Sequence, residues 1–219
     1  SIFKNAADSN LTVMGKYFLT ATKAIRIKAN IGLVSNSEKF NTIKSGQTDP
    51  NVTVEDSWRT TKTAITIGLG IEKRRGKTRL QGIYGGELML FYLDGVKNKY
   101  KYGNSFSKNE IAPVSHNFNG NIAGDIRTTN SKQGATFGLG VRGFVGFEYF
   151  IMPKLSLGME YGLTLSAGSQ GDGQVVTERW DAINAEKKTE TSTIAGGSIF
   201  ELNSGLKNGN ALIYAAFHF

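Results

Sequence analysis

A strict alternation of apolar and polar side chains recurs along most of the 219-residue chain and restricts its fold more than any other feature. Between Ile25 and Leu33 every second residue is apolar, whereas Arg26 and Lys28 occupy intervening positions. Successive side chains of a strand point to opposite faces, but in a helix these two sets would mix around the circumference. The pattern therefore predicts β-strands, each with one apolar face.

The same alternation predicts seven clear strands. They cover residues 11–19, 24–36, 58–73, 79–93, 135–151, 155–166 and 210–219. Most have about the ten residues that a tilted strand needs to cross a membrane, and no run of eighteen apolar residues suggests a membrane helix. Three prolines and 27 glycines, together with 13 phenylalanines and 8 tyrosines, also favour strands separated by turns.

The composition of the polar face distinguishes a soluble β-fold from a membrane barrel. A soluble antiparallel barrel or sandwich would expose a face dense in Lys, Glu, Thr and Ser, but here that face is rich in Gly with isolated charges. Small residues and scattered charges suit the lumen of a narrow barrel. We therefore expect an all-β, transmembrane, up-and-down antiparallel β-barrel in the cell outer membrane, formed as one domain by residues 1–219.

The connections predict an orientation and expose a missing strand. Short turns at residues 20–23, 74–77 and 152–154 suit the periplasmic side, and long polar loops at 35–57, 94–134 and 167–208 suit the extracellular side. Bacterial barrels have an even strand count, and we expect eight strands here, yet only seven are evident. Either the first strand lies in or upstream of residues 1–4 and is incomplete, or residues 198–202 form a separate strand. We favour the first, with residues 195–206 extending the last strand.

The two ends of the chain support this interpretation. The chain starts at Ser1 without Met or an apolar leader, so we expect that a signal peptide has been removed or the chain has been trimmed. The last strand alternates down to a terminal aromatic residue, as in the closing strand of an outer-membrane barrel. Its lipid-facing set is the expected signal for the barrel assembly machinery: Ile213, Ala215, Phe217 and Phe219. The same alternation directs Tyr214 and His218 inward.

Three strand–turn–strand blocks carry a family resemblance. Residues 15–27, 70–88 and 146–160 resemble the corresponding blocks of small outer-membrane β-barrel proteins of the Bacteroidota, whose architecture is similar to eight-stranded OmpA- and OmpX-type barrels. The resemblance implies the fold and an outer-membrane location. It implies no catalytic motif, because that group of proteins is functionally heterogeneous.

The alternation also assigns charged side chains to the lumen. The expected network has four residues of each sign: Lys16, Arg26, Lys28, Arg142, Glu72, Glu87, Glu148 and Glu160. Charges removed from water need partners, and an eight-stranded barrel is just wide enough for side chains to fill it. We expect a paired network that plugs the lumen. The alternative is a narrow, porin-like path for ions or small solutes.

The net charge of +8 must then lie on turns and loops. Its densest cluster is a predicted periplasmic turn near anionic lipid headgroups, with docking of an acidic partner as the alternative: Lys73, Arg74, Arg75, Lys77 and Arg79. The Lys–Tyr alternation of residues 97–102 is weak evidence for nucleic acid, which we do not expect as a partner. A strand extension near lipopolysaccharide suits it better.

Catalytic and metal-binding motifs are absent from the sequence. There is no Cys, metal-ligand spacing, phosphate loop or dinucleotide fingerprint. Neither His116 nor His218 is predicted to lie beside a serine with an orienting carboxylate, so we expect no enzyme, no cofactor and no metal. The expected role is structural or interactive, as an accessory subunit of a larger outer-membrane complex. Small outward residues suggest where another membrane protein could approach: Gly82, Gly86, Gly143, Ala211 and Ala215.

Overall fold

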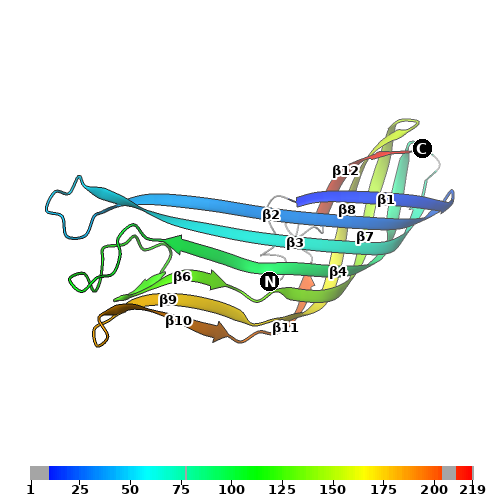
Figure 1. Cartoon of the computed structure of the whole chain (residues 1–219). Helices are drawn as coiled ribbons and strands as arrows, with labels where there is room; N and C mark the ends of the chain where they lie inside the picture. Colours follow the sequence, from blue (N-terminus) through cyan, green and yellow to red (C-terminus); the bar gives the residue numbers. More distant parts are fainter. Residues whose placement is uncertain (1–9, 77, 204–210, 219) are drawn as a thin grey trace.

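A single antiparallel sheet of twelve strands forms the described part of the computed structural model, which covers residues 10–76, 78–203 and 211–218 (Figure 1). The strands are β1 (Asn10–Thr20), β2 (Lys23–Ile43), β3 (Thr53–Arg75), β4 (Leu80–Lys101), β5 (Ile122–Ala123), β6 (Ile126–Lys132), β7 (Thr136–Met152), β8 (Leu155–Gln170), β9 (Gly173–Asp181), β10 (Glu186–Ile194), β11 (Gly197–Asn203) and β12 (Ala211–Phe217). The all-β antiparallel prediction is confirmed. Within these residues no helix has the length and apolar character needed to cross a membrane.

The sheet curls so that β7, β8 and β12 cross behind β1 to β4 (Figure 1). Its hydrogen-bonded order in this curled part is β1, β2, β3, β4, β7, β8 and β12, which reproduces the seven predicted strands. The curl gives the sheet a concave inner face and a convex outer wall. The sheet is not closed, because no backbone pairing among the described residues joins β1 to β12.

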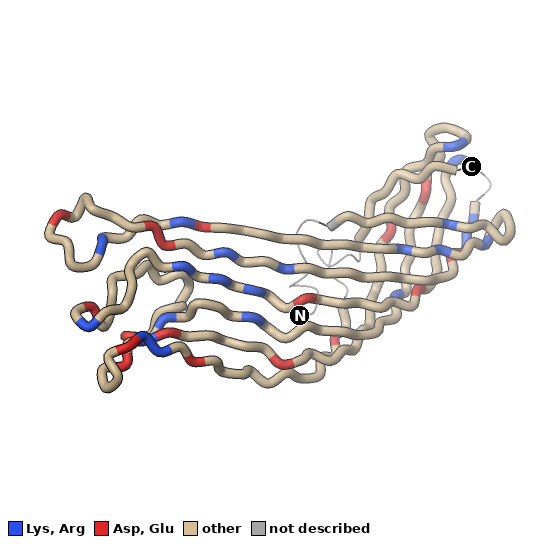
Figure 2. Tube along the Cα trace, in the orientation of Figure 1, with Lys and Arg blue, Asp and Glu red and all other residues tan. Residues whose placement is uncertain are grey.

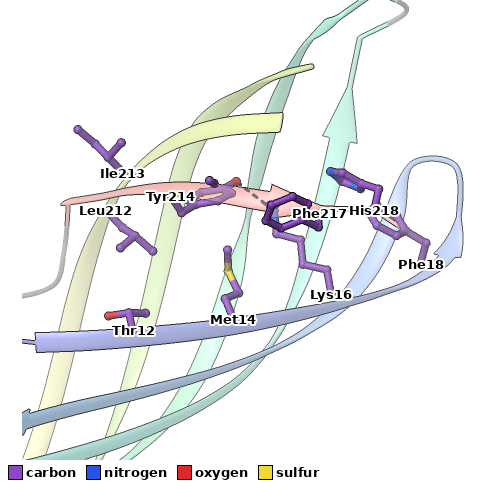
Figure 3. Close-up of a pocket in the computed structure, with 11 residues that line it drawn as sticks. Thr12, Met14, Lys16, Phe18, Leu212, Ile213, Tyr214, Phe217 and His218 are labelled. Atoms are coloured by element: carbon purple, nitrogen blue, oxygen red, sulfur yellow. Dashed lines mark hydrogen bonds between the residues drawn. The ribbon is translucent and has the colours of Figure 1, made fainter. Parts of the chain in front are cut away.

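A seam therefore separates β1 from β12, with a cavity of about 650 Å³ along it. Inward side chains of the two strands face each other across it (Figure 3). Lys16 Nζ donates a hydrogen bond of 3.0 Å to Tyr214 Oη, and the rings of Phe18 and His218 lie 6.1 Å apart. Side chains thus bridge the seam where backbone hydrogen bonds do not.

The last strand is split into two collinear pieces. β11 pairs with residues 164–170 of β8, and β12 pairs with residues 155–161 of the same strand, both antiparallel. The two pieces run in one direction along one edge of β8, as expected if residues 195–206 extend the last strand. Residues 1–4, where a first strand was expected, lie outside the described residues.

The predicted long loops are largely strand, which corrects the sequence interpretation. β2, β3 and β4 have 21, 23 and 22 residues and run far beyond the curled part. These outer parts of β2, β3 and β4, together with β5, β6, β9 and β10, form a second region of the same sheet, here called the extension (Figure 1). Its strands escaped detection because they lack an apolar face; every residue of β10, for example, is exposed.

A bulge in β4 keeps the inner face continuous into the extension. Thr63 pairs with Asp94 but Thr61 pairs with Lys97, so β4 holds one extra residue there. Beyond it Tyr100 lies opposite Trp58, and their rings stack at 6.3 Å. Loop residue Phe118 packs on both rings and is buried, so the loop after β4 covers this face.

Buried polar contacts fasten the same loop. Both carboxylate oxygens of the fully buried Asp56 accept loop backbone hydrogen bonds, from Gly103 and His116, at 2.7 Å each. Arg127 pairs with Glu178 at 2.7 Å. Its guanidinium also lies 4.3 Å from the ring centroids of Tyr102 and Phe106. The extension therefore has its own small core.

The charged residues are unevenly distributed over the sheet (Figure 2). Lys and Arg recur along the parts of β3 and β4 that enter the extension and on neighbouring β6, whereas acidic and basic residues are mixed near the β9–β10 hairpin. The curled part carries its charges mainly near the short turns.

Alkaline pH should loosen the extension. Burial raises the pKa of Tyr102 from 10.0 to about 12. The folded state thus holds this proton more tightly than the unfolded chain, so its stabilising contribution is complete below pH 10 and is lost as the pH rises towards 12. Fluorescence of Trp58 and Trp180, both in the extension, should show easier unfolding by denaturant across that interval.

The Tyr102→Phe variant should flatten this pH dependence, because it removes the titrating group. Tyr92→Phe, on the exposed outer wall, provides the matched control and should keep the native profile. An unchanged profile in Tyr102→Phe would contradict the assignment.

Candidate functional site

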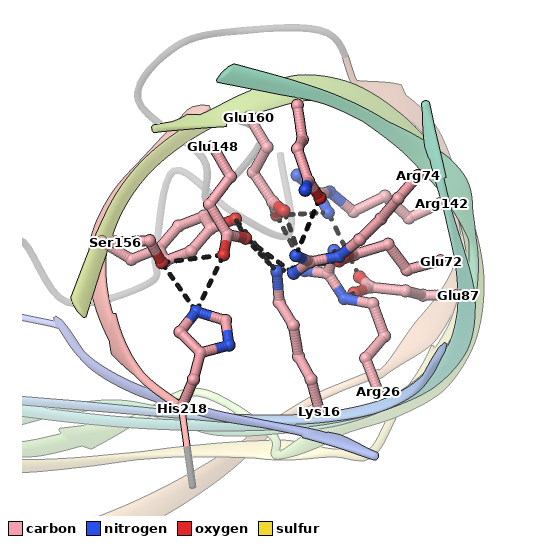
Figure 4. A network of polar contacts seen from close by, with 12 residues as sticks. Lys16, Arg26, Glu72, Arg74, Glu87, Arg142, Glu148, Ser156, Glu160 and His218 are labelled. Atoms are coloured by element: carbon pink, nitrogen blue, oxygen red, sulfur yellow. Dashed lines mark hydrogen bonds and ion pairs between the residues drawn. The ribbon is translucent and has the colours of Figure 1, made fainter. Parts of the chain in front are cut away.

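The inner face of the curled part carries a network of ion pairs between charged side chains that are nearly all buried (Figure 4). All eight residues assigned to the lumen from sequence lie in it: Lys16, Arg26, Lys28, Arg142, Glu72, Glu87, Glu148 and Glu160. They come from six strands, β1, β2, β3, β4, β7 and β8. The network therefore ties together strands that are far apart in the sheet.

Arg26 occupies the centre of this network and is fully buried. Its guanidinium lies 3.2 Å from Glu72, 2.7 Å from Glu87 and 2.9 Å from Glu160. It also stacks over the ring of Phe144 at 4.1 Å. Three carboxylates and an aromatic face thus compensate one buried cation, as a charge without water requires.

Arg142 and Lys28 complete the side of the network that faces the extension. Arg142 bridges Glu160 at 2.9 Å and Glu87 at 3.2 Å, and Lys28 pairs with Glu87 at 2.9 Å. Beyond these residues an apolar layer lies on the inner face, formed by the buried Ala64, Phe91 and Leu93 with Ile199 packed against it. A charged layer and an apolar layer therefore lie in series along the interior.

Lys16 links the seam to the rest of the network. Its Nζ lies 2.9 Å from both Glu72 and Glu148 and donates to Tyr214 Oη. Tyr214 in turn donates a 3.0 Å hydrogen bond to Glu148. The inward position predicted for Tyr214 thus places its hydroxyl between a cation and a carboxylate.

The prediction that Arg74 lies on a solvated periplasmic turn is wrong. Arg74 is buried and pairs with Glu72 and Glu148 at 2.9 Å each. β3 continues to Arg75, so the alternation that directs Glu72 inward directs Arg74 inward as well. Arg74 thus joins the eight predicted residues as a fifth cation in the described ion pairs of this network. Lys73, Arg75 and Arg79 are exposed as predicted, and Lys77 lies outside the described residues.

His218 also corrects the sequence interpretation, because it does lie beside a serine and a carboxylate. Its Nε2 is 2.9 Å from Ser156 Oγ and 3.1 Å from Glu148 Oε1 (Figure 4). A catalytic triad uses one ring nitrogen for the serine and the other for the acid. Here the same nitrogen faces both groups, and Ser156 donates directly to Glu148 at 2.7 Å. This geometry is that of a hydrogen-bonded cluster and lacks the proton relay of a hydrolase.

Glycines on the inner face make room for these long side chains. A Cβ at Gly162 would lie 2.5 Å from the guanidinium of Arg142, and one at Gly158 would lie 2.2 Å from the ring of Tyr214. On the outer wall the opposite holds, since a Cβ at Gly143 or Gly15 would meet nothing within 4 Å. The Gly-rich polar face noted in the sequence is therefore a packing requirement of the charged interior.

The outer wall is apolar and exposed. Ile27, Leu69 and Leu139 are among the many large side chains there that are more than half exposed. The C-terminal set continues this surface: Ile213, Ala215 and Phe217 are exposed on β12, and Phe219 lies outside the described residues. At the short-turn end two cations, Lys23 and Lys73, lie directly opposite each other on this wall.

Comparisons with known proteins add no assignment. No protein-family model and no curated protein sequence matches the chain. In residues 10–76, 78–203 and 211–218, no group of three or more His, Cys, Asp or Glu side chains could hold a metal ion.

Replacing Arg26 by methionine should destabilise the fold by about 3–5 kcal/mol, because buried carboxylates are left without their partner. Lys39→Met is the matched control: Lys39 pairs with Glu55 at 2.9 Å, but both side chains are more than half exposed, so its loss should cost at most about 1 kcal/mol. Denaturant unfolding of the folded protein in detergent measures both. Equal losses would mean that the network does not hold the sheet together.

Proposed function

We propose that the chain is an integral outer-membrane β-barrel with a plugged interior, and that it acts as a structural or interaction protein. The observation that carries this proposal is the inverted distribution of side chains. Charged Arg26, Glu72 and Glu160 are fully or almost fully buried, while large apolar side chains cover the outer wall. A soluble fold would expose the first set and bury the second.

The dimensions of the apolar wall support a membrane location. On β2 the outward residues from Ile25 to Leu33 are all apolar. Nine residues span about 30 Å of strand, which a tilt of roughly 40° shortens to about 23 Å, close to the ~25 Å apolar band of outer-membrane barrels. Tyr92 and Phe137, directly paired on neighbouring strands, end the band as interfacial aromatic residues do.

The seam supports an eight-stranded closure. Seven antiparallel strands leave β1 and β12 running in the same direction, both towards the short turns. One further strand, antiparallel to both, would satisfy the free edges of β1 and β12 and restore an even count. An eighth strand in this position completes the proposed barrel. The short turns and the C-terminus then face the periplasm, and the extension lies outside the cell.

The interior supports a plug in preference to a channel. Ions would have to cross the paired charges around Arg26 and then the apolar layer around Phe91, which is itself almost fully buried. Side chains pack in both layers, and the cavity of about 650 Å³ lies to one side of them, along the open seam between β1 and β12.

Planar-bilayer recordings of the purified protein should show no stable open channels. A general porin measured under the same conditions provides the positive control. Membrane insertion is verified separately, by protease protection and by the heat-dependent gel mobility of folded barrels. Stable conductance from inserted protein would overturn the plug and favour transport of ions or small solutes.

The interaction role has a specific place on the outer wall. Gly86 and Gly143 pair directly across β4 and β7, and a shallow hollow of about 670 Å³ lies over them, bordered by Tyr84, Val145 and Tyr161. Small residues allow another membrane-embedded surface to approach closely. We propose this hollow as the lateral contact of the barrel within a larger outer-membrane complex.

A photoreactive amino acid placed at position 143 should therefore crosslink to a discrete protein in native membranes. The space at this position makes the substitution compatible with folding. Position 67, an exposed isoleucine of the outer wall away from the hollow, provides the control and should crosslink to lipid only. Lipid crosslinks alone at both positions, with recovery of a lone monomer, would count against an accessory subunit.

A further inference from the structure

The outer side of the extension carries an uncompensated basic surface that continues from the end of the apolar band. It is formed by Lys39, Arg59, Lys97, Lys99, Lys101 and Lys132, all exposed. Only two carboxylates pair with it: Glu55 with Lys39, and Asp94 with Lys97. Six cations and two acids leave a surplus of four positive charges, half of the net +8 of the chain.

Two like-charged pairs lie directly opposite each other within this basic surface. Arg59 is the cross-strand partner of Lys99, and Lys97 is the partner of Lys132. Side chains in such positions have their Cβ atoms about 4.5–5.5 Å apart, and like charges there destabilise a sheet. In the described part of the chain no ion pair involves Arg59, Lys99, Lys101 or Lys132. An arrangement that opposes folding in this way is expected where a ligand supplies the missing charge.

The loop that covers the extension lies on the face opposite the basic surface, so it does not neutralise these cations. The loop after β4 packs on the inner face, against Trp58 and Tyr100, and its backbone bonds to Asp56. The cations lie on the opposite face, which the described segments leave exposed. Within residues 10–76, 78–203 and 211–218 no further acidic side chain neutralises these cations, which leaves the surface open to an external anion.

The position of the basic surface identifies the anion. Along β4 the outer wall changes from apolar Leu90 to interfacial Tyr92 and then, past the bulge, to Lys97. This is the order of acyl chains, interface and headgroups in a bilayer. The cations then continue through Lys99 to Lys101, a further ~13 Å along the strand. A simple phospholipid presents phosphate in one layer, whereas a phosphorylated glycolipid carries phosphates on sugars at more than one height.

We propose that this basic surface binds the phosphate groups of a lipopolysaccharide-type glycolipid of the outer leaflet. Arg59, with its planar guanidinium, suits bidentate contact to one phosphate oxygen pair, and Lys99 neutralises the same group. Lys97 and Lys132 form the second pair, nearer the apolar band. The inference rests on the proposed outer-membrane location and adds the lipid class and the residues that bind it.

The test compares two triple variants of the full chain reconstituted in phosphatidylcholine vesicles with a small fraction of purified lipopolysaccharide. Arg59→Gln/Lys99→Gln/Lys132→Gln removes one or both members of each like-charged pair. Lys44→Gln/Lys108→Gln/Lys154→Gln removes the same charge from scattered exposed lysines and is the matched control. Retention of lipopolysaccharide by captured protein should fall about tenfold or more in the first variant and stay within about twofold of the native value in the second.

Two further arms identify the source of the phosphate. Dephosphorylated lipopolysaccharide, and phosphatidylglycerol at matched charge, should both be retained weakly by the native protein. Without anionic lipid, the melting temperature of the first variant should equal or exceed that of the native protein, because repulsion between the paired cations is gone. With lipopolysaccharide, the native protein should have the higher melting temperature. This reversal distinguishes lost binding from lost folding.

Equal retention by the two variants, or equal retention of dephosphorylated lipid or phosphatidylglycerol, would overturn the inference while leaving the barrel intact. Failure of the native protein to insert, measured by protease protection, would instead overturn the proposed function itself.

Discussion

The requirement that a buried charge be paired determines most of this structure. Arg26 can lie in a dry interior only because Glu72, Glu87 and Glu160 reach it from three other strands. Those strands can converge only if the sheet curls, and the curl turns their apolar side chains outward. The charged interior, the Gly-rich inner face and the exposed apolar wall are thus consequences of one set of contacts.

The pairing also explains how an open sheet keeps its shape at the seam. Hydrogen bonds hold each strand to its neighbour, but none in the described residues joins β1 to β12. Lys16 spans this break by reaching Glu72, Glu148 and Tyr214 together. A strand entering the seam would therefore meet two edges already held in place by the side chains beneath them.

Alternation in the sequence was sufficient to predict the seven strands of the curled part and the eight charged residues of its interior. Side chains alternate between the two faces of a strand, so the face on which a residue lies can be predicted without knowing which strands pair.

The incorrect predictions lie at strand ends. Arg74 falls in a predicted turn because the strand predicted over residues 58–73 stops two residues before β3 ends at Arg75, although Arg74 has the same parity as Glu72. The contact of His218 with Ser156 depends on β12 pairing with β8, which no local pattern encodes. The extension was missed because its strands have no continuous apolar face, and its core of Tyr102, Arg127 and Glu178 combines residues far apart in sequence.

The length of β2, β3 and β4 has a mechanical consequence. At about 3.4 Å per residue, the 23 residues of β3 form one rod of roughly 75 Å, with no hinge between the wall and the tip. A flexible loop would let whatever binds at the tip move independently of the wall. A continuous strand instead holds the tip at a constant height and transmits any pull on it directly into the network around Arg26. The extension is therefore joined through continuous strands to a part of the sheet that buried ion pairs hold together.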